Sequence, residues 1–477
     1  VVAEFHQSGD FLSSKRYEGT LSLDVLGALA PLAHDLSKAF DYGQILGKAL
    51  FQEQVRDALM KVRGNSKGGV RLLLVIEEPS LRPLHWECLC APIGTNASWR
   101  HLALDQRLLF SHYLPSLAER RFPAIGKADL RALVVVANPQ PGNRYVAAFD
   151  GPSTVASVRQ ALGDIPHDVL SNVPDAQGPA SLDEICARIT AQHYTMLHIV
   201  AHGWHRPTDG ETILYLLDEQ GNVRPTTVTK LIERLDQLEG AHGLPHLAFL
   251  STCESAAPLA EKEGALGGMA QRLVRELGMP AVVAMTRRVA IPTANALASS
   301  FYERLREHGE VDRALVEAGA KLADAEDITV PALYGRLGGR PLFSDTLDRP
   351  LTDTEIGFGL AELEQLLLKR APVLGPRLAD AASKIRGSLG ADHSALSEAT
   401  RAEWDGALAE ANALCEEALD LNFRALSLKQ KPPVYNASCP FPGLAAFQPS
   451  DRRFFFGREA VTEKLLRRLS EHPFLAL

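Results

Sequence analysis

Two reactive side chains follow short apolar runs near the middle of the chain. His202 comes directly after residues 195–201, Thr-Met-Leu-His-Ile-Val-Ala. Cys253 comes shortly after residues 247–250, Leu-Ala-Phe-Leu. An imidazole beside a thiol raises the thiolate fraction at neutral pH, because the ring takes up the thiol proton. If the fold brings the two residues together, the pattern predicts a cysteine nucleophile with a histidine base.

Both apolar runs have the character of buried strands. They are short, continuous and bounded by turn-forming residues, which is typical of strands covered on both faces of a parallel sheet. We expect the first strand to break at His202–Gly203 and the second to end at Ser251. Function in open parallel sheets collects just beyond the carboxyl ends of the strands, so this topology would place His202 near Cys253.

Each reactive residue also has a simpler explanation when it is considered alone. A single cysteine after an apolar strand is more often an inert buried thiol, and His-Gly is often only a turn. His198, His202 and His205 could also suggest a metal site. However, the i, i+4 histidine pair of a zinc protease requires a helix, and this segment is predicted to be a strand. We therefore expect no metal, and the two strand ends together favour a dyad.

The motifs resemble those of the CHAT family of clan CD cysteine peptidases, which are relatives of caspases, gingipains and separase. The family carries His-x-x-x-His-Gly, matching residues 198–203, and Ser-x-Cys-Glu-[Ser/Thr], matching residues 251–255. The resemblance covers residues 17 to 345, with further matching segments at 71–76, 84–87, 264–267, 279–285, 301–302 and 340–343. His85 departs from the pattern, because the family usually has Pro there, but it lies far from the dyad in sequence.

The resemblance implies that Cys253 attacks the peptide carbonyl and that His202 transfers the proton, with no clear third catalytic member in the sequence. The backbone amides of Gly203 and Cys253 are the natural oxyanion donors, since both are predicted to lie in strand-end turns. Clan relatives often hold an acid in the S1 pocket and cleave after Arg or Lys. The candidates for that acid are Asp150, Asp209 and Glu211, each of which could instead be a solvated loop carboxylate.

The order of predicted elements indicates an α/β fold. Strands are expected at 71–76, 86–89, 102–109, 130–137, 195–201, 213–218, 247–251 and 281–285. Helices are expected within 21–62 and at 152–162, 181–192, 226–238, 265–277, 293–308 and 311–325. A capping box, Ser181 with Glu184, is predicted at the start of one of them. Alternating strands and helices predict a caspase-like, mostly parallel sheet flanked by helices.

Composition changes along the chain divide it into four predicted parts. Residues 1–125 are expected to form an N-terminal α/β subdomain of the CHAT region, and residues 126–345 the caspase-like peptidase domain. Residues 350–432 are rich in Ala, Leu, Glu and Arg and predict a helical linker or a small bundle. Residues 436–477 resemble the opening of a STAND-type NTPase module. They hold no Gly-x-x-x-x-Gly-Lys-[Ser/Thr] loop, so we expect ATP or GTP with Mg²⁺ only on an NTPase portion beyond Leu477, and no cofactor here.

The overall composition limits which binding partners and which cellular location can be expected for the protein. A chain of 477 residues is too long for one core, and its 46% hydrophobic and 23% charged residues are ordinary for a soluble protein. The net charge of −8 provides no excess of positive charge that would indicate nucleic-acid binding. No run is long enough to cross a bilayer and no leader is visible, so no membrane partner is expected. Six scattered cysteines predict reduced thiols and a cytoplasmic protein.

Two classes of function follow. The first is a cysteine endopeptidase acting on protein substrates. The resemblance implies that it is the effector of an NTPase-regulated bacterial signalling or defence protein that self-associates through the NTPase module. The second is a catalytically silent caspase-like scaffold that binds partners. The presence of both His202 and Cys253 favours the enzyme, since a scaffold needs neither.

Overall fold

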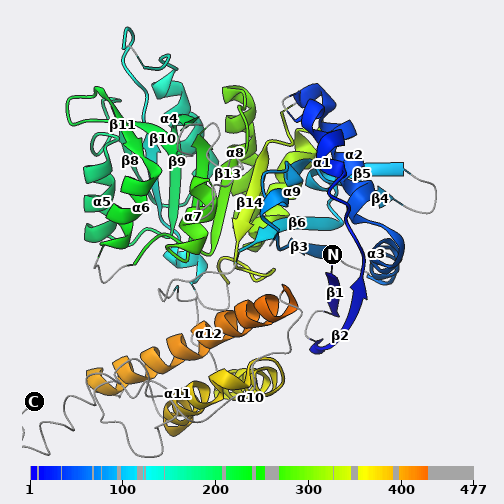
Figure 1. The fold of residues 1–477 in the computed structure, drawn as a ribbon. Coiled ribbons are helices and arrows are strands. Elements are labelled where there is room, and N and C mark those ends of the chain that lie inside the picture. The colour runs from blue at the N-terminus through cyan, green and yellow to red at the C-terminus, as the bar shows by residue number, and fades with distance from the viewer. Residues whose placement is uncertain are drawn as a thin grey trace, which may run out of the picture.

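A single large sheet organises the fold (Figure 1). The structure is a computed structural model of the chain. It describes residues 2–7, 10–33, 35–66, 69–76, 78–93, 98–114, 122, 125–143, 145–206, 211–238, 243–252, 268–325, 327–344, 353–389 and 397–427. Within these residues the sheet has ten strands.

Five neighbouring strands of this sheet are parallel. In spatial order they are β8 (His167–Ser171), β7 (Ala132–Val136), β9 (Met196–Arg206), β12 (Leu247–Thr252) and β13 (Ala281–Met285). Every residue of β7 and β13 is buried. Strands covered on both faces need apolar side chains at consecutive positions, which explains their nearly continuous apolar sequences. The prediction of a largely parallel α/β sheet is confirmed.

The sheet continues beyond β13 with strands of the opposite direction. β14 (Pro331–Gly335) is antiparallel to β13, and it is followed by β6 (Leu108–Tyr113) and β3 (Val70–Leu74), both parallel to β14. Strands from the first 125 residues therefore extend the same sheet that carries His202.

The expected break at His202–Gly203 is wrong, because β9 runs on to Arg206. Up to Ala201 the strand lies between β7 and β12. From His202 onward it pairs instead with β10 (Glu211–Leu217), which pairs in turn with β11 (Val223–Thr227). The strand continues past His202–Gly203 because another strand pairs with it there. That strand is β10 of the β10–β11 hairpin.

Helices cover both faces of the parallel strands (Figure 1). One face packs on α5 (Leu182–Ala191), α6 (Val228–Asp236) and α7 (Met269–Arg275). The other packs on α4 (Gly151–Leu162), α8 (Ile291–His308) and α9 (Val311–Lys321). The Ser181 hydroxyl accepts from the Glu184 amide at 3.1 Å, which forms one half of the predicted capping box. The Glu184 carboxylate accepts instead from Arg188 Nε at 2.7 Å.

The N-terminal region has its own apolar core against β3 and β6. Its further elements are β1 (Val2–Gln7), β2 (Asp10–Glu18), α1 (Val25–Leu29), α2 (Ala39–Leu50), α3 (Glu53–Asn65), β4 (Cys90–Ile93) and β5 (Ser98–His101). Two predicted strands, 86–89 and 102–109, begin instead as short 3₁₀ turns at Trp86–Cys88 and Leu102–Leu104. A short apolar run does not distinguish a buried turn from a strand.

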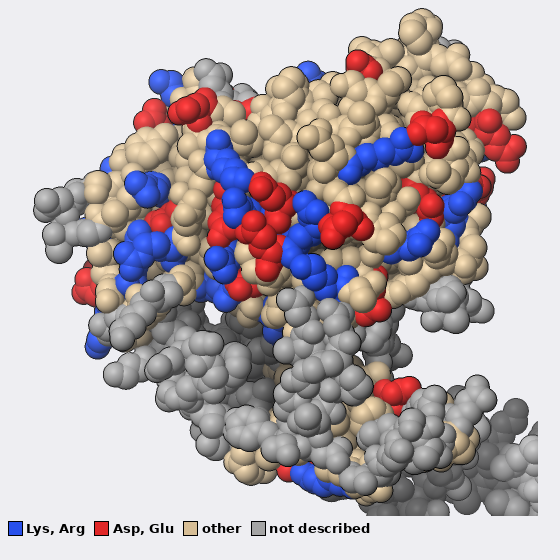
Figure 2. All heavy atoms as spheres, turned by 180° about the vertical axis from the view of Figure 1, so that it is seen from behind, with Lys and Arg blue, Asp and Glu red and all other residues tan. Residues whose placement is uncertain are grey.

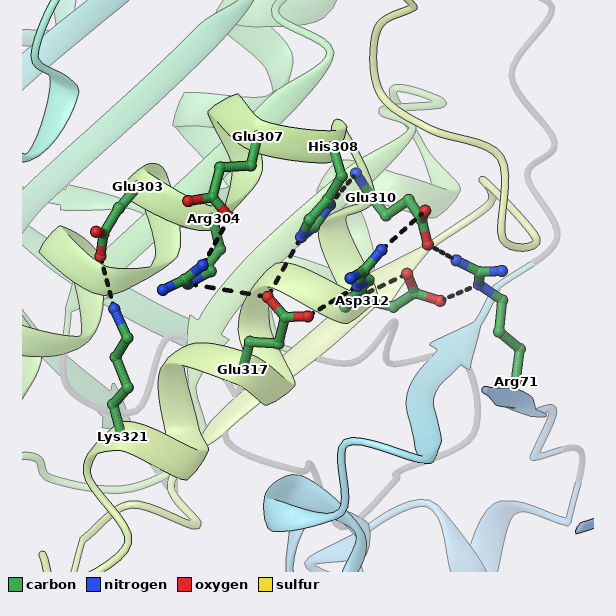
Figure 3. A network of polar contacts seen from close by, with 10 residues as sticks. Arg71, Glu303, Arg304, Glu307, His308, Glu310, Asp312, Glu317 and Lys321 are labelled. Carbon is green, nitrogen blue, oxygen red and sulfur yellow. Dashed lines mark hydrogen bonds and ion pairs between the residues drawn. The ribbon is translucent and has the colours of Figure 1, made fainter. Parts of the chain in front are cut away.

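Two ion pairs join this region to the helices of the main sheet (Figure 3). Arg71 of β3 bonds to Asp312 of α9 through Nε at 2.8 Å, and a second pair joins Arg71 to Glu310. The surface of α8 and α9 carries further pairs, including Lys321 with Glu303 at 2.7 Å. Figure 2 shows acidic and basic side chains next to one another on the face seen from behind.

The C-terminal helices share a separate apolar core. They are α10 (Asp353–Arg370), α11 (Gly375–Gly387) and α12 (Glu398–Ser427). They lie beside the main body in Figure 1. Within the described ranges, none of the helices combines the length and the apolar character needed to cross a bilayer. Residues 436–477 lie outside the described part of the chain.

Candidate active site

His202 lies on β9 at the point where the strand exchanges its neighbours. Its Nε2 atom lies 2.8 Å from the backbone carbonyl oxygen of Ala147. A carbonyl oxygen can only accept a hydrogen bond, so Nε2 carries the proton in the neutral ring. The lone pair of the neutral ring is therefore on Nδ1, and Nδ1 is the atom that can act as a base.

The segment that supplies this carbonyl is held by two asparagines. Asn143 Oδ1 accepts from the amides of Tyr145 and Val146 at 2.9 and 3.0 Å, and its Nδ2 donates to the Val146 carbonyl at 2.7 Å. Asn138 Oδ1 accepts from the Phe149 amide at 3.0 Å. Asparagine favours such local bonds to the backbone, which fix a loop without regular structure. The Ala147 carbonyl is thus positioned between two clamped points.

Phe149 also contacts the imidazole directly. The two rings meet edge to face, with centroids 5.7 Å apart and an interplanar angle of 66°. His202 is therefore oriented by a hydrogen bond at one nitrogen and by an aromatic contact on its ring.

Cys253 lies outside the described residues, but the strand that leads to it is described. Thr252, the residue before Cys253, pairs with Ala201, the residue before His202, in the parallel register of β12 and β9. Neighbouring strands lie about 4.8 Å apart. The two chain positions that carry the predicted dyad therefore follow paired residues on adjacent strands.

Gly203 does not lie in the predicted strand-end turn. It pairs with Leu214 in the antiparallel register of β9 and β10, because the strand continues past His202. The assignment of the Gly203 and Cys253 amides to an oxyanion hole stays a prediction.

Two of the three candidate S1 carboxylates are described, and both have partners in the fold. Asp150 caps α4 by accepting from the Ser153 amide at 2.9 Å. Glu211 accepts from the Thr229 hydroxyl at 2.6 Å and lies 3.9 Å from the Arg272 guanidinium. Asp209 lies outside the described residues. A role for any of the three in substrate binding stays a prediction.

His198 belongs to the core. It is 1% exposed, stacks on Phe249 with centroids 5.1 Å apart, and has the Tyr302 hydroxyl 2.9 Å from its Nδ1. Burial lowers the pKa of His198 to about 3, so the ring is neutral at physiological pH. Across the described ranges, no three His, Cys, Asp or Glu side chains gather in a way that could hold a metal ion.

A buried carboxylate at the end of β13 has no counterpart among the predicted site residues. Glu87 is 3% exposed and accepts from the Thr286 hydroxyl at 2.6 Å, with His85 Nδ1 at 2.9 Å. Burial raises the pKa of Glu87, but the bond to His85 and the nearby positive charge of Arg287 outweigh it and leave the pKa below its ordinary value. The hydrogen bond from Thr286 to Glu87 ties the N-terminal region to the residues that follow β13, and His85 is the second partner of this carboxylate. His85 is the departure from the family pattern.

The fold and site together define a mixed α/β protein with a largely parallel sheet flanked by helices and an oriented histidine on a central strand, where that strand leaves the parallel pairing. The CHAT domain family model matches residues 41–354, and the model of Novel STAND NTPase 1 matches residues 440–477. The chain belongs to the CHAT domain family, and its CHAT domain is followed by a segment of a STAND NTPase.

The chain is less similar to solved structures than to the family model. The crystal structure of the Arg-specific cysteine proteinase gingipain R (RGPB) aligns with a TM-score of 0.36 at 11% identity, over 64% of this chain and 75% of that chain. The complex of Porphyromonas gingivalis RgpB pro- and mature domains aligns with a TM-score of 0.36 at 10% identity, over 67% and 78%. No curated protein matches the chain.

Proposed function

We propose that the protein is a cysteine endopeptidase in which Cys253 is the nucleophile and His202 the general base. The observation that carries this proposal is the orientation of His202. Its Nε2 is held by the Ala147 carbonyl, which leaves Nδ1 as the basic atom. The pairing of Thr252 with Ala201, the residues that precede Cys253 and His202 in the sequence, supports the proposed dyad. Membership in the CHAT family supports the same chemistry.

The reaction follows from these two groups. His202 Nδ1 takes the proton of the Cys253 thiol, and the thiolate attacks the peptide carbonyl carbon to form a C–S bond. The C–N bond then breaks, and the imidazolium returns its proton to the leaving amine. A water molecule, deprotonated by the same nitrogen, attacks the thioester. The C–S bond breaks, the acid product leaves and the thiol is restored.

In this proposal the Ala147 carbonyl is the group that positions the imidazole of His202. The hydrogen bond from Nε2 fixes the tautomer of His202 and lowers the energy of the imidazolium. The Asp carboxylate has the same effect on the histidine of a Ser-His-Asp triad. A neutral carbonyl can do this without titrating, so its contribution does not depend on pH.

Cleavage after Arg or Lys is the proposed specificity, with Asp150, Asp209 or Glu211 as the acid that binds the basic side chain. Asp150 and Glu211 would have to exchange or share their present partners to serve. A peptide library that varies the residue before the scissile bond tests this. Cleavage only after other residues would overturn the basic preference.

Regulation by an NTPase is proposed from the STAND segment that follows the CHAT domain. The NTPase portion would bind ATP or GTP with Mg²⁺ and cluster the peptidase domains in a bacterial signalling or defence response. Cys88, Cys90 and Cys186 are free thiols, which fits a reducing compartment, and we place the protein in the cytoplasm.

The test is cleavage of a protein-derived peptide library by the wild-type chain, Cys253→Ala and His202→Ala, with unfolding curves to show that the variants fold. Cleavage by the wild type alone is expected. No cleavage by any of the three would favour the silent scaffold, and equal cleavage by the wild type and Cys253→Ala would overturn the assignment of Cys253 as the nucleophile.

A further inference from the structure

Four aromatic side chains are connected to His202 by ring contacts or by the register of β9 and β10. They form what we call the aromatic shelf: Tyr145, Phe149, Trp204 and Tyr215. Two come from the segment between β7 and α4, and two from the paired strands β9 and β10. The shelf is built entirely from residues that the structure describes.

The strand register places the β-strand members on one face with His202. Tyr215 is directly opposite His202 in the antiparallel pair, so the two side chains share a face of the sheet. Trp204 is two residues further along β9 and points to the same face. The Tyr145 ring lies against the Tyr215 ring with centroids 6.2 Å apart, and Phe149 meets His202 edge to face.

The outer members of the shelf are open to solvent. Trp204 is 42% and Tyr145 44% exposed, which is high for large aromatic side chains in a folded domain. Exposed apolar surface next to a candidate active site is typical of a ligand-binding surface. The clamps at Asn138 and Asn143 order the segment that presents Tyr145 and Phe149, so the surface is preformed.

Two carboxylates close to the shelf along the chain have partners in the fold. The Asp150 carboxylate caps α4, and the Glu211 carboxylate bonds to Thr229. The shelf therefore offers aromatic faces and edges, which favour an apolar or aromatic ligand side chain.

We infer that the aromatic shelf binds an apolar side chain of the substrate on the carboxyl-terminal side of the scissile bond. This inference rests on the proposed peptidase function. His202 donates its proton to the leaving amine, so the leaving half of the substrate passes closest to the ring. Phe149 of the shelf contacts that ring, and Tyr215 is paired with His202 across the strands. It selects residues such as Phe, Leu or Met just after the cleaved bond, independently of the residue before it.

The cleavage experiment uses peptides with one fixed sequence before the scissile bond and Phe, Leu, Ser or Asp after it. Wild-type protein is expected to cleave the Phe and Leu peptides with kcat/KM at least tenfold above the Ser peptide, since burying an apolar side chain has an effect of that size. Trp204→Ala and Tyr145→Ala should each remove most of this ratio. Phe40→Ala is the matched control, because Phe40 is 43% exposed and lies on α2.

A binding experiment separates this inference from the proposed function. The same peptides are titrated into Cys253→Ala by calorimetry, with and without Trp204→Ala. The Phe and Leu peptides should bind about tenfold more tightly than the Ser peptide. Trp204→Ala should abolish this difference in affinity. Equal affinities for the Phe and Ser peptides would overturn the shelf, whether or not the wild type cleaves them. Selective binding without cleavage by the wild type would instead overturn the peptidase and, with it, the placement on the leaving side.

Discussion

His202 Nε2 and the carbonyl oxygen of Ala147 lie 2.8 Å apart, although 55 residues separate them in the sequence. This contact fixes which nitrogen of the ring is basic. It also gives the site a third group that comes from the backbone, whose chemistry does not depend on the side chain at position 147.

The geometry of the 138–150 segment should therefore control catalysis from outside the dyad. Asn143→Ala removes the side-chain bonds to Tyr145 and Val146 that shape the segment. We expect kcat to fall at least tenfold, because a small displacement of the carbonyl releases the imidazole. The measurement is steady-state cleavage beside a thermal unfolding curve.

A matched substitution separates this effect from general loop damage. Asn222→Ala changes another turn asparagine, which bonds to Asp218 between β10 and β11, and it should leave kcat within about twofold. Full activity in Asn143→Ala would show that the segment does not need this clamp.

The ion pairs of Arg71 should stabilise the junction between β3 and α9 (Figure 3). Asp312 has an 8% exposed side chain, so Arg71→Ala leaves a nearly buried carboxylate without its partner. We expect a loss of about 1–3 kcal/mol in the free energy of unfolding. Urea denaturation measures it.

Lys321→Ala is the comparison for Arg71→Ala, since it removes an exposed ion pair between α8 and α9. Its side chain is 43% exposed and that of Glu303 is 50% exposed. Such pairs contribute about 0–1 kcal/mol. If both variants lose the same small amount, the β3–α9 junction is not held by Arg71.

Buried neutral histidines should make the protein sensitive to mild acid. Burial lowers the pKa of His112 to about 4, only partly opposed by the charge of Glu87, and burial lowers the pKa of His198 to about 3. An unfolded histidine binds a proton near pH 6.5, so the unfolded state takes up protons first as pH falls. Stability should be complete above pH 6.5 and decrease between pH 6.5 and 4, by about 3 kcal/mol for His112.

His112→Phe tests this titration, because the ring stacks on Tyr334 with centroids 4.6 Å apart and a phenyl ring can keep that contact. The variant should show a smaller decrease in unfolding free energy from pH 6.5 to 4.5. The depressed pKa of Glu87 adds a loss only at lower pH, as the pH falls below about 4.5 toward the folded pKa. An unchanged pH profile in His112→Phe would contradict the assignment.

The strands of the parallel sheet could be predicted because burial on both faces leaves a local signal. The apolar runs at 132–136, 247–252 and 281–285 each form a strand. The signal fails for β8, which begins with His167 and Asp168, and for β14, which begins with Pro331. Both lack the continuous apolar character that marked the others.

The site was predictable only where residue type carries the chemistry. His202 and Cys253 are candidates because their side chains are reactive, whereas a backbone carbonyl such as that of Ala147 has no signature in the sequence. The extension of β9 past His202 depends on pairing with β10, which is a tertiary contact. The cap that Asp150 forms on α4 was likewise not predicted from the sequence, and its role in substrate binding stays a prediction.

The most direct test is the rate at which iodoacetamide alkylates Cys253 in the folded chain between pH 5 and 9, with the labelled residue mapped by mass spectrometry. Burial raises the pKa of the Cys88 and Cys90 thiols to about 12, so they should stay unmodified and serve as internal controls. We expect Cys253 of the wild type to react near pH 6, where an ordinary thiol is protonated, and His202→Ala to react at least tenfold more slowly there. Equal rates in the two proteins, or a Cys253 that remains unmodified in the folded wild type, would contradict the dyad.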